Sequence, residues 1–154
     1  MQMNALTEAF GDKFVCLGFP CNQFGHQTQE SDQEIPLLLE HVRPGEGYKP
    51  NFPMFSKLNV NGTGEDELFT FLKAALPYPS DDKGGLGSDH ISDNSHGQPF
   101  LWSPIRRSDL TWNFEKFLIN QNGVPVKRYS PKFPTEDCAA DIKALIENGP
   151  NALF

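Results

Sequence analysis

The stretch FVCLGFPCNQFG, residues 14–25, decides the fold class that the sequence predicts. Its first half, residues 14–19, is a short and almost wholly apolar run, which is typical of a strand buried on both faces in a mainly parallel sheet. A polar loop, residues 20–29, follows this strand. Because ligands of open α/β sheets bind beside loops at strand ends, Gln23 is a candidate site residue. The alternative is an amide that only satisfies the backbone of the loop.

Helical patterns surround this strand in the sequence. Residues 1–10 carry apolar side chains at helical spacing and have no capping residue at their start, so we expect the chain to begin inside a helix. Ser31 and Glu34 have the spacing of a capping box, which predicts a helix that continues to Val42. Residues 65–76 predict a further amphipathic helix.

The C-terminal part predicts a β-hairpin and a last helix. Two apolar runs, residues 114–119 and 124–129, flank an Asn-Gly turn, which is a strong hairpin signal. Residues 134–148 place their apolar side chains on one helical face. The order α-β-α-α-β-β-α predicts an α/β layer sandwich that lacks its first strand and forms a single domain over residues 1–154.

Composition excludes several classes of protein. The 154 residues carry 13 Lys and Arg against 20 Asp and Glu, a formal net charge of −7, which argues against nucleic acid or an anionic membrane as a partner. The longest apolar runs are only a few residues, far short of the roughly 20 that span a bilayer. Three cysteines are too few and odd in number for a disulfide framework, so we expect a reducing, cytoplasmic location.

The cysteines and histidines offer little chemistry of their own. Cys16 lies in the predicted buried strand and Cys138 on the apolar face of the last helix, so both are expected to pack in the core. Cys21 lies in the polar loop and is the one candidate for a reactive thiol. We expect no metal site, because the histidines show no metal-ligand spacing. They are His26, His41, His90 and His96.

Trp112 and Asn113 begin the predicted hairpin and form the next candidate group. An indole supplies one N–H donor on a rigid apolar plane, and the adjacent amide supplies two more. Such a pair can stabilise an anion such as a thiolate or a selenolate. The alternative is that Trp112 simply packs in the core.

Four separate segments of the chain resemble glutathione peroxidases, most closely the selenium-dependent cytosolic type. They are GFPCNQFGHQ (18–27), VRPGEGYKPNF (42–52), WSPIRRSDLTWNFEKFL (102–118) and GVPVKRYSPKFPT (123–135). The resemblance implies a thioredoxin-like fold. It also implies an active-site tetrad in which a peroxidatic selenocysteine or cysteine is joined by Gln23, Trp112 and Asn113.

The peroxidatic residue itself has no counterpart among the cysteines of this sequence. In the family it lies at the turn between the first core strand and the first helix, whereas Met1 resembles a position about two turns inside that helix. We therefore expect the selenocysteine or cysteine to be encoded upstream of Met1 and the 154 residues alone to be inactive. A selenocysteine codon read as a stop would produce such a chain.

The resemblance implies that a selenolate or thiolate cleaves the O–O bond of hydrogen peroxide or an organic hydroperoxide, and that two glutathione molecules then restore the enzyme, in the response to oxidative stress. Glutathione is a co-substrate here, so no bound cofactor is expected. It carries two carboxylates, and the family places basic residues against it at positions that match Arg43, Lys127 and Arg128.

The reductant and the assembly follow from the same resemblance. Thioredoxin-dependent relatives carry a resolving cysteine after the first motif, and residues 28–60 contain none, which favours glutathione. The region 77–99 resembles the loop of tetrameric members and predicts a homotetramer. Two alternatives remain: a non-catalytic thioredoxin-fold binding module that lacks the nucleophile, and a thioredoxin-dependent peroxidase.

Overall fold

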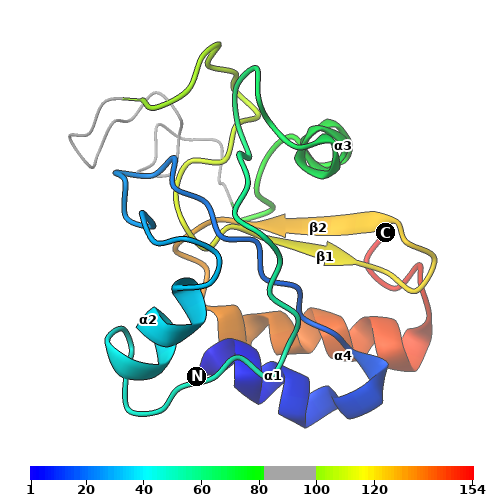
Figure 1. Cartoon of the computed structure of the whole chain (residues 1–154). Coiled ribbons are helices and arrows are strands. Elements are labelled where there is room, and N and C mark those ends of the chain that lie inside the picture. The colour runs from blue at the N-terminus through cyan, green and yellow to red at the C-terminus, as the bar shows by residue number, and fades with distance from the viewer. Residues whose placement is uncertain (82–99) are drawn as a thin grey trace.

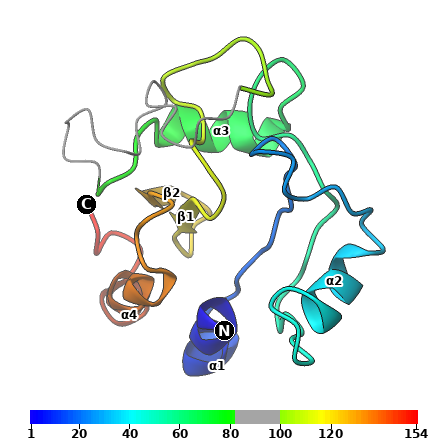
Figure 2. The ribbon, with the colours of Figure 1, turned by 90° about the vertical axis from the view of Figure 1, so that its left-hand side faces the viewer.

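A central β-hairpin separates two layers of helices in the computed structural model of the protein (Figures 1 and 2). The structure describes residues 1–81 and 100–154. One layer holds α1 and α4, which lie side by side beneath the hairpin, and α3 covers the opposite side (Figures 1 and 2). The elements are α1 (Gln2–Phe10), a 3-10 turn (Gly11–Lys13), α2 (Ile35–His41), α3 (Glu67–Ala75), β1 (Lys116–Ile119), β2 (Pro125–Tyr129), a second 3-10 turn (Thr135–Asp137) and α4 (Cys138–Asn148).

The predicted hairpin is confirmed. The strands β1 and β2 pair antiparallel, with Phe117 opposite Arg128 and Leu118 opposite Lys127. Asn120 closes the turn, because its side-chain oxygen accepts hydrogen bonds from the backbone N–H groups of Asn122 and Val124. Since successive residues of a strand face opposite sides of a sheet, Lys127 and Arg128 point into different layers.

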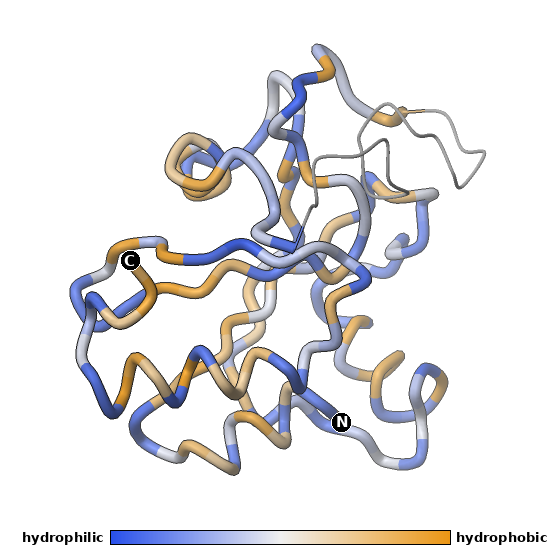
Figure 3. The backbone as a smooth tube through the Cα atoms, turned by 180° about the vertical axis from the view of Figure 1, so that it is seen from behind, coloured by the Kyte–Doolittle hydropathy of each residue, from blue (hydrophilic) through white to orange (hydrophobic). Residues whose placement is uncertain are grey.

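Each face of the hairpin carries its own apolar core. The lower core, between the hairpin and the helices α1 and α4, consists of Leu6, Leu118, Val126, Tyr129, Cys138, Ile142 and Leu145. The upper core, beneath α3, consists of Cys21, Phe24, Val60, Phe69, Leu72 and Leu110. Figure 3 shows apolar residues along β1 and recurring along the helices beneath the hairpin, whereas β2 carries a polar stretch. The hairpin thus shields two separate clusters from water.

Side-chain hydrogen bonds lie at the start of α3 and just before α2. Asp66 caps α3, because its carboxylate accepts the backbone N–H of Leu68 at 3.0 Å. Only half of the expected capping box forms before α2: Glu34 Oε2 accepts the N–H and the hydroxyl of Ser31, both at 2.8 Å, but the hydroxyl caps no helix N–H, and α2 begins after Glu34 without a side-chain cap. These hydrogen bonds lower the pKa of the Glu34 carboxyl. The helix α2 itself is shorter than predicted and leaves Val42 exposed.

The prediction of a strand buried on both faces over residues 14–19 is wrong. Val15 is 58% exposed and Leu17 is 46% exposed. The segment forms one parallel bridge, between Gly18 and Met54, in which Gly18 donates to Pro53 O at 2.9 Å. Within residues 1–81 and 100–154 no strand pairs with its other edge. Val15 and Leu17 stay exposed, whereas Phe14 packs against the lower core and Phe19 against the upper core.

The long region 77–99 is described only at its start. Ser80 donates its backbone N–H to Arg128 O at 2.7 Å, and Asp81 accepts the backbone N–H and the hydroxyl of Ser130. These contacts attach the segment after α3 to the end of β2. Residues 82–99, on which the expectation of a tetramer rests, lie outside the described residues. No helix in the described ranges is long and apolar enough to cross a membrane.

We expect replacement of both Val15 and Leu17 by threonine to change the free energy of unfolding by less than about 1 kcal/mol, because both side chains are exposed. Leu145→Ala, which truncates a buried side chain of the lower core, is the comparison and should lower the free energy of unfolding by about 2–5 kcal/mol. Urea unfolding followed by circular dichroism measures both. A loss above about 2 kcal/mol for the threonine pair would contradict the exposed placement of this segment.

Candidate active site

Gln23 is held against the backbone of residues 60 and 61. Its Oε1 accepts the N–H groups of Val60 at 2.8 Å and of Asn61 at 3.0 Å, and its Nε2 donates to Asn61 O at 2.9 Å. The side chain is only 8% exposed. A buried amide with these partners has one conformation, because any rotation would leave buried polar groups unpaired. The loop over residues 20–29 therefore holds Gln23 in a fixed position. The Nε2 atom of Gln23 carries a second N–H, which could donate to a ligand.

Trp112 and Asn113 lie against the same loop. The indole ring of Trp112 packs on Phe24, with the ring centroids 5.8 Å apart. Asn113 Nδ2 donates to Gln27 Oε1 at 2.9 Å. The structure thus brings together the two segments that carry the candidate residues, although they are about 90 positions apart in the sequence. Trp112 is half-buried and packs against the upper core, as the packing alternative expected, and its role as a donor stays a prediction.

The candidate residues on the two adjacent segments carry N–H donors and no carboxylate. Each amide has two N–H donors and the indole has one. Such a group favours an anionic form of a bound atom and lowers the pKa of an acid that ionises there. The chemistry that the site can support is therefore stabilisation of a thiolate, a selenolate or an oxyanion.

A buried charged cluster lies behind the site and was missed by the sequence analysis. Lys73, on α3, is 3% exposed and forms ion pairs with Glu65 and with Asp109 Oδ1, the latter at 3.1 Å. Asp109 Oδ2 also accepts the indole N–H of Trp102 at 2.9 Å. One signal was available, because Lys73 interrupts the apolar stripe that Phe69 begins four residues earlier.

The three predicted glutathione contacts lie in different surroundings. Arg128 is 1% exposed, with its Nε bound to Glu115 Oε2 at 2.7 Å and its other nitrogens bound to backbone carbonyls. The carbonyls belong to Leu76, Pro77, Ser108 and Asp109. A contact between Arg128 and glutathione stays a prediction and would require this network to open.

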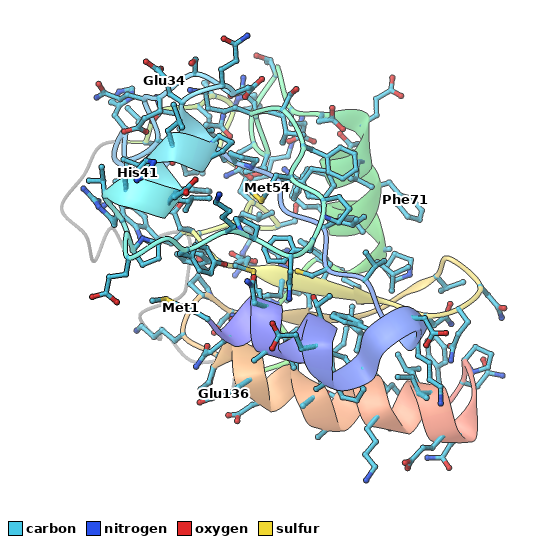
Figure 4. The ribbon with its side chains drawn as sticks, turned by 60° about the horizontal axis from the view of Figure 1, so that its bottom comes forward. Met1, Glu34, His41, Met54, Phe71 and Glu136 are labelled. Atoms are coloured by element: carbon cyan, nitrogen blue, oxygen red, sulfur yellow. The ribbon has the colours of Figure 1, made fainter. Side chains whose placement is uncertain are left out.

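Lys127 faces the lower layer. Its Nζ lies 2.8 Å from Asp141 Oδ2 on α4, and it is partly exposed. Arg43 is exposed, and its guanidinium has no hydrogen bond or ion pair within residues 1–81 and 100–154. Figure 4 shows His41, two residues before Arg43, at the end of α2 and apart from α4. Of the three cations, Arg43 is thus the one that can take a new anionic partner without breaking a contact to the described part of the chain.

Cys21 and Cys138 are buried, whereas Cys16, expected in the core, is only half-buried. Burial raises the pKa of Cys16 and of Cys21, although the N–H of Gln23 partly offsets this at Cys21. Burial also raises the pKa of Cys138 to about 11. A thiol that stays protonated is a poor nucleophile at neutral pH. In the described ranges, no group of three or more His, Cys, Asp and Glu side chains could hold a metal ion; His90 and His96 lie outside those ranges.

Comparison with known proteins identifies the family. The family model described as glutathione peroxidase matches residues 1–73. Over 152 residues the chain is 49% identical to glutathione peroxidase 1 of Macaca fuscata fuscata, a match that covers 98% of this chain and 72% of the relative. Glutathione peroxidase 1 of Rattus norvegicus is 48% identical over 151 residues, covering 97% of this chain and 72% of the relative. The chain belongs to the glutathione peroxidase family.

Solved structures of the glutathione peroxidase family share the fold. The apo form of Trgpx matches with a TM-score of 0.55 and 25% identity, covering 95% of this chain and 69% of that one. T. cruzi GPX1 matches with a TM-score of 0.55 and 26% identity, covering 94% and 69%. The predicted α/β, thioredoxin-like class is confirmed. The roles of Gln23, Trp112 and Asn113 in this family member stay predictions.

We expect the raised pKa of Cys138 to make stability depend on pH in the alkaline range. In the unfolded chain this thiol loses its proton near its ordinary value of 9.0, and in the folded protein only near 11. The protonated thiol of Cys138 therefore contributes its full stability below pH 9. As the pH rises towards 11, this contribution is lost, and the free energy of unfolding falls by about 2–3 kcal/mol.

Urea unfolding at intervals between pH 7 and 11 measures this dependence, with Cys138→Ala as the comparison. The alanine variant should be less stable by a constant amount below pH 9, and the difference should shrink above it. A difference that stays constant to pH 11 would contradict the raised pKa.

Proposed function

We propose that the protein reduces hydrogen peroxide and organic hydroperoxides with glutathione, as a single domain over residues 1–154. The observation that carries the proposal is the meeting of the two segments that hold Gln23 and Trp112-Asn113, through the Phe24–Trp112 and Gln27–Asn113 contacts. Membership of the glutathione peroxidase family supports the reaction class, and the name of the relatives, glutathione peroxidase 1, supports glutathione and a peroxide as the substrates.

The peroxidatic group is proposed to be a selenocysteine or cysteine N-terminal to Met1. Support comes from the three thiols of this chain, whose raised pKa values leave little thiolate at neutral pH. The absent group would supply the nucleophile that attacks the peroxide. Gln23, Trp112 and Asn113 would donate hydrogen bonds that hold its anionic form, since each of the three side chains carries at least one N–H donor.

Glutathione is proposed to bind through its carboxylates. Arg43 is exposed and has a free guanidinium among the described residues, so it is the first candidate for a charge-assisted contact. Lys127 would have to exchange Asp141 for the ligand. Arg128 would have to release the carbonyls of Ser108 and Asp109 to contact glutathione.

The reductant, the assembly and the location complete the proposal. Residues 28–60 contain no cysteine that could resolve an oxidised nucleophile, which favours glutathione over thioredoxin. We propose a homotetramer and a cytoplasmic location, with neither nucleic acid nor membrane as a partner. The net charge of −7 agrees with that choice of partners.

The proposal is tested by adding the residues encoded upstream of Met1 and measuring peroxide-dependent NADPH oxidation coupled through glutathione and glutathione reductase. The extended chain should turn over, and the 154-residue chain should not exceed the background rate. Cys21→Ser in the extended chain is the control and should leave the rate unchanged. An inactive extended chain, or one that works only with thioredoxin, would overturn the proposal in favour of a binding module or a thioredoxin-dependent peroxidase.

We expect Arg43→Ala in the extended chain to raise the KM for glutathione by about 2–10-fold, because an exposed charge contact is lost. The effect should shrink as salt is added, and the rate of oxidation by peroxide should not change. Lys143→Ala removes an exposed cation from α4, where Lys143 lies beside Glu147, and is the matched control. Equal losses in both half-reactions would refute the assignment of Arg43 to glutathione.

A further inference from the structure

Asn61 occupies the point where the two halves of the candidate site meet. It is 1% exposed and lies 38 positions after Gln23. Its backbone N–H donates to Gln23 Oε1, and its carbonyl accepts from Gln23 Nε2. The amide of Gln23 therefore pairs with the peptide of Asn61 in both directions, as one strand pairs with another. Rotation of either group would break two buried hydrogen bonds at once.

The side chain of Asn61 makes the same kind of pair with a second segment. Its Oδ1 accepts the N–H of Leu110 at 2.9 Å, and its Nδ2 donates to Leu110 O, also at 2.9 Å. Leu110 is fully within the upper core and precedes Trp112 by two residues. One residue thus holds Gln23 through its main chain and the approach to Trp112 through its side chain.

Lys73 fixes which way the Asn61 amide points. Its ammonium donates to Asn61 Oδ1 at 3.3 Å, in addition to its ion pairs with Glu65 and Asp109. The three donors of the ammonium thus meet three acceptors. A flipped amide would turn its NH₂ group towards the cation and its oxygen towards Leu110 O. The buried charge therefore selects the orientation that allows the pair with Leu110.

The residues on either side of Leu110 are held as well. Arg128 donates to the carbonyls of Ser108 and Asp109, and Glu115 Oε1 accepts the N–H of Thr111 at 2.6 Å. The main chain from 108 to 111 is thus bound by buried side chains at each residue. Movement of Trp112 relative to this framework is limited to its own side chain and the peptide before it.

We propose that Asn61 is a positioning residue of the active site, which sets how Gln23 lies relative to Trp112 through its paired contacts with Gln23 and Leu110. The inference rests on the proposed function, because that function assigns Gln23 and Trp112 to one active site. The contact between Phe24 and Trp112 is the rival route by which the two could be coupled.

The test measures coupling by ¹H–¹⁵N nuclear magnetic resonance on the 154-residue chain, with no substrate present. In the otherwise unaltered chain, Gln23→Glu should shift the signals of the Leu110 amide and the Trp112 indole. In the background of Asn61→Asp, which keeps the size of the side chain and loses its Nδ2 donor, that shift should fall by at least about half. Asn59→Asp, an exposed residue two positions earlier, is the matched control and should leave the shift intact.

A shift that is unchanged by Asn61→Asp would assign the coupling to the Phe24–Trp112 packing and overturn the proposal. Hydrogen exchange in the unaltered chain gives a second measurement that needs no variant. The N–H groups of Asn61 and Leu110 should exchange at the same slow rate, because they open together. Exchange of Leu110 about tenfold faster than Asn61 would overturn the proposal. Neither measurement depends on peroxide reduction, so its outcome is separate from that of the activity assay.

Discussion

The buried guanidinium of Arg128 is the constraint on which the surrounding structure depends. A charge that is 1% exposed is tolerated only where each of its donors has a partner. The partners of Arg128 come from three places: Glu115 near the start of β1, the carbonyls at the end of α3, and the carbonyls of Ser108 and Asp109. Satisfying one cation therefore fixes the end of α3 and the segment leading to Trp112 against the hairpin.

The parts of the fold that the sequence predicted well depend on short-range interactions. The hydrogen bonds from Ser31 to Glu34, the cap at Asp66 and the hairpin turn at Asn120 each join residues within a few positions of one another. Burial of residues 14–19 depends instead on which strands lie beside them, and an apolar run does not carry that information. The expectation failed there for that reason.

The candidate site was likewise predicted in part from the sequence. The motifs pointed to Gln23, Trp112 and Asn113, and the structure brings the segments that carry them together. The groups that hold them were not foreseen, because Asn61 and Lys73 come from segments without a chemical motif of their own. Lys127 and Arg128 are adjacent in the sequence, yet one pairs with α4 and the other lies beneath α3, so their shared motif does not make them one functional unit.

The uncovered edge at residues 14–17 has a consequence for how the protein behaves in concentrated solution. An extended segment with unpaired backbone groups and exposed Val15 and Leu17 can act as a template on which another chain adds a strand. Two features limit this self-association. Lys13 places a charge directly before the segment, and Pro20, which has no N–H donor, follows it. This exposed apolar segment is thus bounded at both ends by residues that oppose the growth of an intermolecular sheet.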